Sequence, residues 1–155
     1  MQPDGRGARI SSHDTGLESP MRTALTLALC LAAAPLVAQE TSERAGIEDV
    51  ISRQLQAFND RDVSEAWRHA SPMIQRLFGT AENFGTMVET GYPMVWSNSD
   101  ARFLELDERG AAWLQRVLVK GPEGAMHVVE YEMIRTEDGW KINGARILPA
   151  PDVGV

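Results

Sequence analysis

Apolar residues recur every three or four positions between residues 41 and 58. The stripe consists of Ile47, Val50, Ile51, Leu55 and Phe58, and most of the positions between them are charged or polar. This spacing predicts an amphipathic helix that packs one face against a core.

Three shorter helices are predicted over residues 63–70, 72–78 and 81–90. Asp62, Ser71 and Thr80 precede them, and these residue types accept hydrogen bonds from the free N–H groups of a first helical turn. A glycine follows each of the last two helices, as is common where helices end. Tyr92-Pro93 then predicts an extended segment, because proline disfavours helical geometry in the residue before it.

From residue 101 onward the pattern changes to alternating segments rich in Val, Ile, Tyr and Trp, which is typical of β-strands. Turn-forming Gly, Pro and Asp residues interrupt it three times. The predicted strands are 101–107, 111–120, 126–135 and 140–148. The order of elements predicts an α+β fold, with N-terminal helices packed on a curved, mainly four-stranded antiparallel sheet.

The turns predict which side chains share a face of this sheet. A four-residue turn at Gly121-Pro122-Glu123-Gly124 would place Lys120 opposite Ala125, and alternation assigns the remaining positions. The face predicted to meet the helices holds Phe103, Glu105, Asp107, Leu114, Arg116, Leu118, His127, Val129, Tyr131, Met133, Trp140, Ile142, Arg146 and Leu148. The other face holds Trp113, Gln115, Val117, Val119, Val128, Glu130, Glu132, Ile134, Lys141 and Asn143. A β-bulge would exchange the two faces beyond it.

Glu105, Arg116, His127 and Tyr131 form an unexpected polar group on the predicted helix face. Glu105 and Arg116 lie diagonally on neighbouring strands and are expected to pair, since an unpaired buried charge is costly. One interpretation is a pocket that binds a small polar or anionic ligand through Arg116 and His127. The alternative is that these residues lie at the open end of the sheet and are satisfied by water and by one another.

Three functions remain open on these residues. The leading hypothesis is a non-catalytic module that binds a small ligand or a partner. The second is an acid–base enzyme of isomerase or dehydratase type, with Glu105 or His127 acting beside Tyr131. The third is a homodimeric structural partner in the cell envelope.

The predicted outer face carries an apolar patch of Trp113, Val117, Val119 and Val128, with Ile134 nearby. Soluble proteins rarely leave such a patch in water, so it predicts a weak homodimer. The alternative cover is the C-terminal tail, residues 149–155.

The N-terminal region resembles an export signal. A basic start at Met21-Arg22, an apolar run over residues 24–36 and a small residue at Ala38 are typical of a secretory signal peptide over residues 21–38. Cleavage is expected before Gln39, which leaves residues 39–155 as a single exported domain, periplasmic or secreted, without a stable membrane anchor. Residues 1–20 are interpreted as a mis-assigned start or a disordered leader.

The composition of the chain limits which partners and cofactors are expected. The net charge is −7, and it stays −7 without residues 1–38, which carry three basic and three acidic side chains. An acidic surface without basic clusters argues against nucleic acid. Cys30, the only cysteine, lies within the signal, so the exported domain holds no disulfide. His69 and His127 lie on different elements, and neither a metal nor a cofactor is expected.

Several short motifs together resemble a known family. They are Gln54-x-x-Ala57-Phe58, Ala66, Ala70-Ser71-Pro72, Phe78-Gly79, Phe84, Met87-Val88 and Gly91-Tyr92-Pro93. The resemblance is to a bacterial secreted family, domain of unknown function 4864, over residues 47–148. The late motif Asp138-Gly139-Trp140-Lys141-Ile142 also resembles the end of nuclear transport factor 2-like domains. That resemblance implies a cone in which a long helix crosses a curved sheet and can leave a pocket between them. It implies no activity, because the superfamily contains isomerases, dehydratases, epoxide hydrolases and non-catalytic modules.

Overall fold

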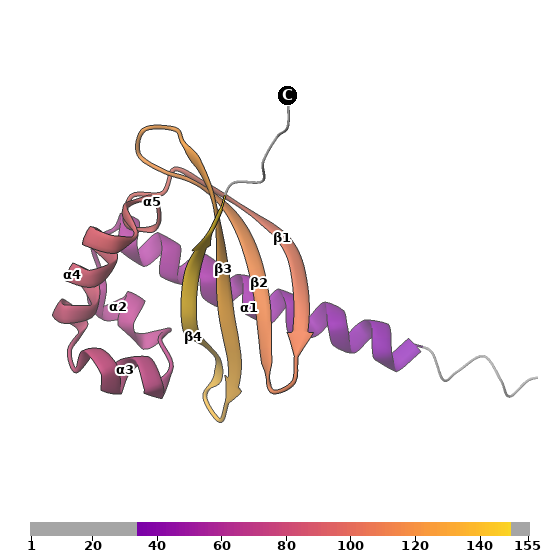
Figure 1. Ribbon diagram of the computed structural model, residues 1–155. Helices are drawn as coiled ribbons and strands as arrows, with labels where there is room; N and C mark the ends of the chain where they lie inside the picture. Colours follow the sequence, from indigo (N-terminus) through magenta and orange to yellow (C-terminus); the bar gives the residue numbers. More distant parts are fainter. Residues whose placement is uncertain (1–33, 150–155) are drawn as a thin grey trace, which may run out of the picture. The chain divides into compact units, whose positions relative to one another are not determined.

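Five helices precede a four-stranded sheet in the computed structural model, which describes residues 34–149 (Figure 1). The helices are α1 (Ala34–Asn59), α2 (Val63–Arg68), α3 (Pro72–Phe78), α4 (Ala81–Gly91) and α5 (Pro93–Trp96). The strands are β1 (Asp100–Arg109), β2 (Ala112–Lys120), β3 (Met126–Thr136) and β4 (Gly139–Leu148). The predicted α+β class is confirmed. The predicted leader over residues 1–20, most of the predicted signal peptide and most of the C-terminal tail lie outside the described residues.

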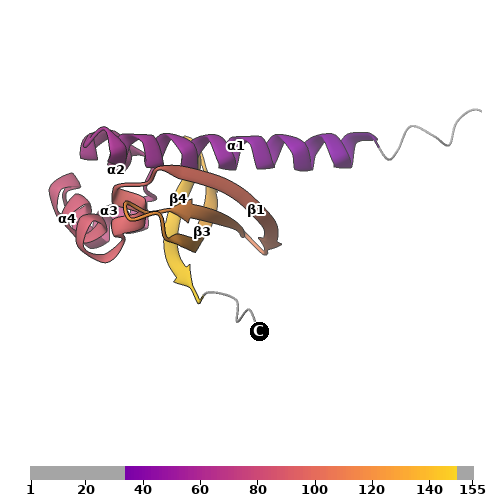
Figure 2. The same cartoon turned by 90° about the horizontal axis from the view of Figure 1, so that it is seen from above.

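Helix α1 runs along one face of the sheet, while α2, α3 and α4 gather beside β4 (Figures 1 and 2). The predicted stripe faces the core: Ile47 and Ile51 are fully buried, and Leu55 and Phe58 are nearly so. The helix begins at Ala34, seven residues before the predicted start. Within residues 34–149, no helix combines the length and the apolar composition needed to cross a bilayer.

The three predicted helix caps are confirmed. The side chains of Asp62, Ser71 and Thr80 each accept a hydrogen bond from the backbone N–H three residues later, at 2.9, 3.2 and 3.2 Å. Each bond satisfies one donor that the helix itself leaves free. The helices α2, α3 and α4 therefore begin directly after the capping residues that the sequence predicts.

The extended segment predicted after Tyr92 is wrong. Tyr92 has non-helical geometry, as the proline requires, but Pro93 then opens the short helix α5. Proline suits the first position of a helix because the N–H that it lacks would have no helical partner there. This short helix places Met94 and Val95 in the core.

The strands form a meander in the order β1-β2-β3-β4, and every neighbouring pair is antiparallel. The predicted strand order is therefore confirmed, and the observed strand ends differ from the predicted ones by no more than two residues.

The turn between β2 and β3 holds five residues instead of the expected four. Lys120 pairs with Met126 and not with Ala125, because the Gly121 N–H donates to the Ala125 carbonyl at 2.9 Å and closes a longer turn. Gly124 adopts a positive φ of 81° within it, a conformation that glycine allows without steric cost. A shift of one residue moves every side chain of a strand to the opposite face.

The predicted faces are consequently right for β3 and wrong for β2. Val129, Tyr131 and Met133 on β3 meet the helices as predicted. On β2 the helix face is formed instead by its fully buried residues Gln115, Val117 and Val119. The β2 residues on the opposite face are Leu114, Arg116 and Leu118, all of them only half-buried.

A bulge in β4 reverses the faces of its last residues. Met133 pairs with Ile142, but its neighbour Glu132 pairs with Gly144, so Asn143 is an extra residue. Trp140 and Ile142 lie in the core as predicted, whereas Arg146 and Leu148 lie on the face away from the helices, opposite the predicted one.

A second bulge displaces part of β1. Phe103 pairs with Val117, but the register shifts before Leu106. Glu105 falls within this bulge and is exposed, and Asp107 pairs with Leu114 on the face away from the helices. Both residues therefore lie away from the predicted helix face.

The predicted dimer patch does not exist as a surface. Val117 and Val119 are fully buried beneath the helices, and Trp113 is half-buried with its ring edge-to-face against Trp140, at a centroid distance of 6.3 Å. Of the four residues, Val128 alone lies on the face away from the helices. The homodimer stays a prediction, but the buried Val117 and Val119 cannot form its interface.

Candidate functional site

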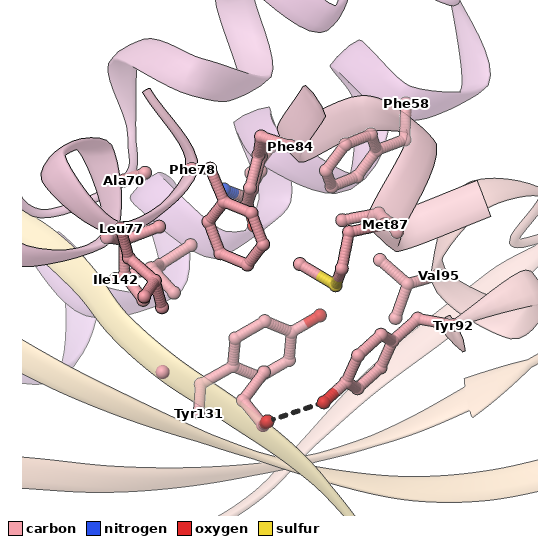
Figure 3. A pocket seen from close by; sticks show the side chains of 15 residues that line it. Phe58, Ala70, Leu77, Phe78, Phe84, Met87, Tyr92, Val95, Tyr131 and Ile142 are labelled. Atoms are coloured by element: carbon pink, nitrogen blue, oxygen red, sulfur yellow. Dashed lines mark hydrogen bonds between the residues drawn. The ribbon is translucent and has the colours of Figure 1, made fainter. Parts of the chain in front are cut away.

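A cavity of about 220 Å³ lies where the short helices meet β3 and β4 (Figure 3). Its lining is almost entirely apolar. The lining residues are Gln54, Phe58, Ala70, Ile74, Leu77, Phe78, Phe84, Met87, Val88, Tyr92, Val95, Tyr131, Ile142, Gly144 and Ala145.

Three phenylalanine rings form one wall of the cavity. Phe84 lies between the other two, with ring centroids 5.9 Å from Phe58 and 5.8 Å from Phe78. The three rings come from α1, α3 and α4, so the wall exists only after these helices have packed together. Aromatic contacts of this kind stabilise a pair by about 0.5–1.5 kcal/mol beyond simple burial.

The connection between α2 and α3 holds the cavity against β4. Ser71 donates its backbone N–H to the Ile142 carbonyl, and Ile142 donates its own to the His69 carbonyl, both at 2.8 Å. The Ser71 hydroxyl also donates to Asn143 Oδ1 at 2.8 Å. This connection covers part of the β4 edge and positions Ala70 and Ile142 in the lining.

Tyr131 supplies the cavity's unpaired polar group. Its side chain is 2% exposed, and its hydroxyl has no hydrogen-bond partner within residues 34–149. Figure 3 shows the hydroxyl pointing into the cavity toward the side chain of Met87. Burial, with a smaller contribution from Tyr92, raises the pKa of Tyr131 well above its ordinary value. The phenol therefore keeps its proton and is available as a hydrogen-bond donor.

Tyr92 differs from Tyr131 because its proton is already engaged. The Tyr92 hydroxyl donates to the Ala145 carbonyl at 2.9 Å, just beyond the β4 bulge (Figure 3). This bond links the start of α5 to the sheet edge and fixes the Tyr92 ring as a side wall of the cavity.

The cavity opens beside α3. Leu77 is a lining residue that is nevertheless 69% exposed, and Ile74 is half-buried. Leu77 therefore lies at the open side of the cavity.

The chain matches a protein family over most of its length. Residues 40–155 match the family described as Domain of unknown function (DUF4864). The chain belongs to this family. No curated protein and no solved structure is similar enough to the chain to count as a match.

In this DUF4864 domain the four predicted site residues do not meet in one place. Tyr131 alone lines the cavity. Glu105 is exposed in the β1 bulge, and Arg116 lies on the other face of the sheet. His127 is half-buried near the β2–β3 turn, four residues and roughly 13 Å from Tyr131 along β3.

The predicted pairing of Arg116 with Glu105 is replaced by another. Glu130 is 3% exposed and accepts hydrogen bonds from Arg116 Nε at 3.1 Å and from Arg146 Nε at 2.8 Å. A further bond joins Arg146 Nη2 to the same carboxylate. Burial alone would raise the pKa of Glu130, but the hydrogen bonds with Arg146 and Arg116 outweigh it and hold the pKa below the usual range.

A shallow hollow lies beside this ion-pair cluster on the face away from the helices. Its lining residues are Leu114, Glu130, Glu132, Gly144, Ala145 and Arg146, around a volume of about 340 Å³. Its carboxylates are already engaged, since Glu130 binds two arginines and Glu132 accepts from Asn143 Nδ2 at 2.5 Å. No group of three or more potential metal ligands occurs within residues 34–149.

Sequence reasoning missed Tyr92 and Gln54 as site residues of the DUF4864 domain. Tyr92 was interpreted only through its effect on the backbone before proline. Gln54 lies beside the predicted stripe of α1, and it is buried because its Nε2 donates to the Ala66 carbonyl at 3.1 Å. The available signal was the Gly91-Tyr92-Pro93 motif, in which a large amphipathic ring precedes a rigid turn.

Proposed function

We propose that this domain is exported and binds a small, largely apolar molecule in the cavity between α3, α4 and the β3–β4 pair. The observation that carries this proposal is the buried hydroxyl of Tyr131, which points into a largely apolar cavity and has no hydrogen-bond partner within residues 34–149. An unsatisfied buried hydroxyl costs about 1–3 kcal/mol, so a stable fold retains one more readily where a ligand satisfies it.

The volume limits the size of the ligand. A cavity of about 150 Å³ holds benzene, a molecule of six heavy atoms. By proportion, the 220 Å³ of this cavity suits a ligand of roughly nine heavy atoms. The lining favours a ring or a branched chain, because the wall consists of aromatic and aliphatic groups.

The composition of the lining supports binding over acid–base catalysis. The fifteen lining residues, all within the described part of the chain, include no Asp, Glu, His, Lys or Arg. Proton abstraction needs a base within hydrogen-bond reach of the substrate. Glu105 and His127, the bases of the enzyme hypothesis, do not line the cavity.

Export and wider kinship belong to the same proposal. The signal-like residues 21–38 support secretion, and a long helix against a curved sheet is an arrangement similar to that of nuclear transport factor 2-like domains. In that superfamily a pocket can lie between the long helix and the sheet, which agrees with a cavity lined in part by Gln54 and Phe58 of α1.

Two matched substitutions on α3 test the proposal. Ile74→Trp adds bulk at a lining residue, whereas Met73→Trp adds the same ring at the adjacent residue, which is 43% exposed and does not line the cavity. Titration with α-methylstyrene, a neutral molecule of nine heavy atoms, is followed by amide chemical shifts. Binding is expected for the unmutated domain and for Met73→Trp, and is expected to disappear in Ile74→Trp. Equal binding by all three proteins would place the probe elsewhere and contradict the proposal.

A further inference from the structure

The hydroxyls of the two tyrosines in the cavity differ in whether they can donate a hydrogen bond to a ligand or only accept one. Tyr92 has committed its proton to the Ala145 carbonyl, so its oxygen can only accept. The Tyr131 hydroxyl has no hydrogen-bond partner in the described part of the chain and can donate. A buried donor without a hydrogen bond costs more free energy than an acceptor with an unused lone pair. A ligand that accepts from Tyr131 therefore gains more than one that donates to Tyr92.

The uncharged lining of the cavity disfavours ligands that carry a charge. None of the lining residues, which all fall within residues 34–149, carries a formal charge at neutral pH. A carboxylate or an ammonium group would lose its water on entering and find no counter-ion. Gln54, which is also polar, already uses its amide nitrogen to hold the Ala66 carbonyl.

We infer that the cavity selects neutral molecules that carry one hydrogen-bond-accepting oxygen, such as a ketone, an ester or an ether, and that the Tyr131 hydroxyl is the donor that selects them. The inference rests on the proposed function and adds to it the ligand class and the residue responsible. Tyr131 keeps its proton across the working pH range because burial raises its pKa, so the donor does not switch off in neutral solution.

The position of the donor makes the selection geometric as well as chemical. Tyr131 extends from β3 on the floor of the cavity, and the rings of Phe58, Phe78 and Phe84 stand opposite it (Figure 3). A ligand therefore places its apolar body against the aromatic wall and its oxygen toward the sheet.

Three probes of nine heavy atoms separate the possibilities. Acetophenone carries the ketone, α-methylstyrene replaces its oxygen with a methylene group, and benzoate carries a negative charge on a similar frame. Dissociation constants are measured for the unmutated domain and for Tyr131→Phe, which removes only the hydroxyl. Because water solvates a ketone better than an alkene, the informative quantity is the change between the two proteins.

The expected result is a selective loss. Acetophenone should bind about tenfold more weakly to Tyr131→Phe, the effect of one hydrogen bond, while α-methylstyrene should bind both proteins equally or the variant slightly better. Benzoate should bind the unmutated domain at least tenfold more weakly than acetophenone. Without ligand, Tyr131→Phe should unfold at a higher temperature than the unmutated domain, because it no longer buries an unpaired donor.

Other outcomes overturn the inference at identifiable points. If neither neutral probe binds the unmutated domain, the proposed function fails and the inference fails with it. If both neutral probes bind but lose affinity equally in Tyr131→Phe, the proposed function stands and the selection by Tyr131 is wrong. Benzoate binding as tight as that of acetophenone would show that a cation reaches the cavity. A lower unfolding temperature for Tyr131→Phe would show that the hydroxyl has a partner within the protein.

Discussion

Replacing Glu130 with glutamine should destabilise the domain by about 2 kcal/mol at pH 7. Glu130 lies in the centre of a row of three cross-strand partners, with Arg116 on β2 and Arg146 on β4 directly opposite it. Its carboxylate is 3% exposed, so the substitution removes a buried charge while it preserves the shape of the side chain.

The magnitude follows from the exposure of the two arginines. A hydrogen bond to a charged group contributes about 1.5–3 kcal/mol when it is buried, but an exposed ion pair contributes about 1 kcal/mol or less. The side chain of Arg116 is 38% exposed and that of Arg146 is 69% exposed. Solvent therefore screens Arg146 strongly, and most of the loss should come from Arg116. Glutamine keeps one acceptor oxygen, which lowers the total to about 2 kcal/mol.

The penalty should depend on pH in a defined direction. The pKa of Glu130 is lower in the folded domain than the ordinary value of about 4.3, so its ionisation favours the folded state. This contribution is complete above the unfolded pKa and is lost as the pH falls through the folded pKa. Glutamine does not titrate, so the difference between the two proteins should shrink from pH 7 to pH 3.

Urea unfolding followed by tryptophan fluorescence at pH 7 and pH 3 measures both effects. For a domain of about 115 residues, a loss of 2 kcal/mol corresponds to a fall of about 8 °C in Tm. Glu105→Gln is the matched control, because this carboxylate is exposed and forms no ion pair within residues 34–149. A penalty within 0.5 kcal/mol of the control, or one of the same size at both pH values, would refute the reasoning.

Three other outcomes are expected. Ser71→Ala should cost about 2 kcal/mol in urea unfolding, since the hydroxyl both caps α3 and donates across to β4, and a cost below about 0.5 kcal/mol would reduce its role to a minor one. Gly46→Ala should destabilise the domain by about 1 kcal/mol, because a Cβ there would lie 2.9 Å from Trp140 Cδ1. Gly91→Ala has open space around its Cβ and should be neutral or stabilising, so equal Tm shifts for the two variants would contradict this reasoning. N-terminal sequencing of exported protein should begin near Gln39, and a product that retains residues 1–20 would contradict export through this signal.

Local chemistry accounts for the parts of the fold that the sequence predicted well. The stripe of α1 and the caps at Asp62, Ser71 and Thr80 depend on residues within one or two helical turns of each other, so their spacing is visible in the chain. The strands are equally visible because alternation and turn residues mark their ends. The strand order required only that consecutive antiparallel segments pair with their neighbours, which short turns enforce.

The faces of the sheet depend on contacts that no local pattern contains. One additional turn residue at Ala125 and one additional bulge residue at Asn143 were enough to move Arg116 and Arg146 to the face away from the helices. Because side chains alternate with a period of two, a one-residue uncertainty in register becomes a complete uncertainty about the face. The predicted polar pocket combined residues from opposite faces for this reason.

For Tyr131, the sequence predicts some of its properties and the tertiary structure decides the others. Its face on β3 was predicted correctly from alternation, and its residue type already indicated an apolar ring with a polar end. Its role as an unpaired donor in a cavity follows only from the packing of α3, α4 and α5 beside the sheet, which surrounds the hydroxyl with apolar groups and engages the neighbouring Tyr92 elsewhere. Periodicity along the chain thus decided which elements form and which way β3 faces. The long-range packing that excludes water decided that the Tyr131 hydroxyl has no partner within residues 34–149, and the proposed ligand site rests on this hydroxyl.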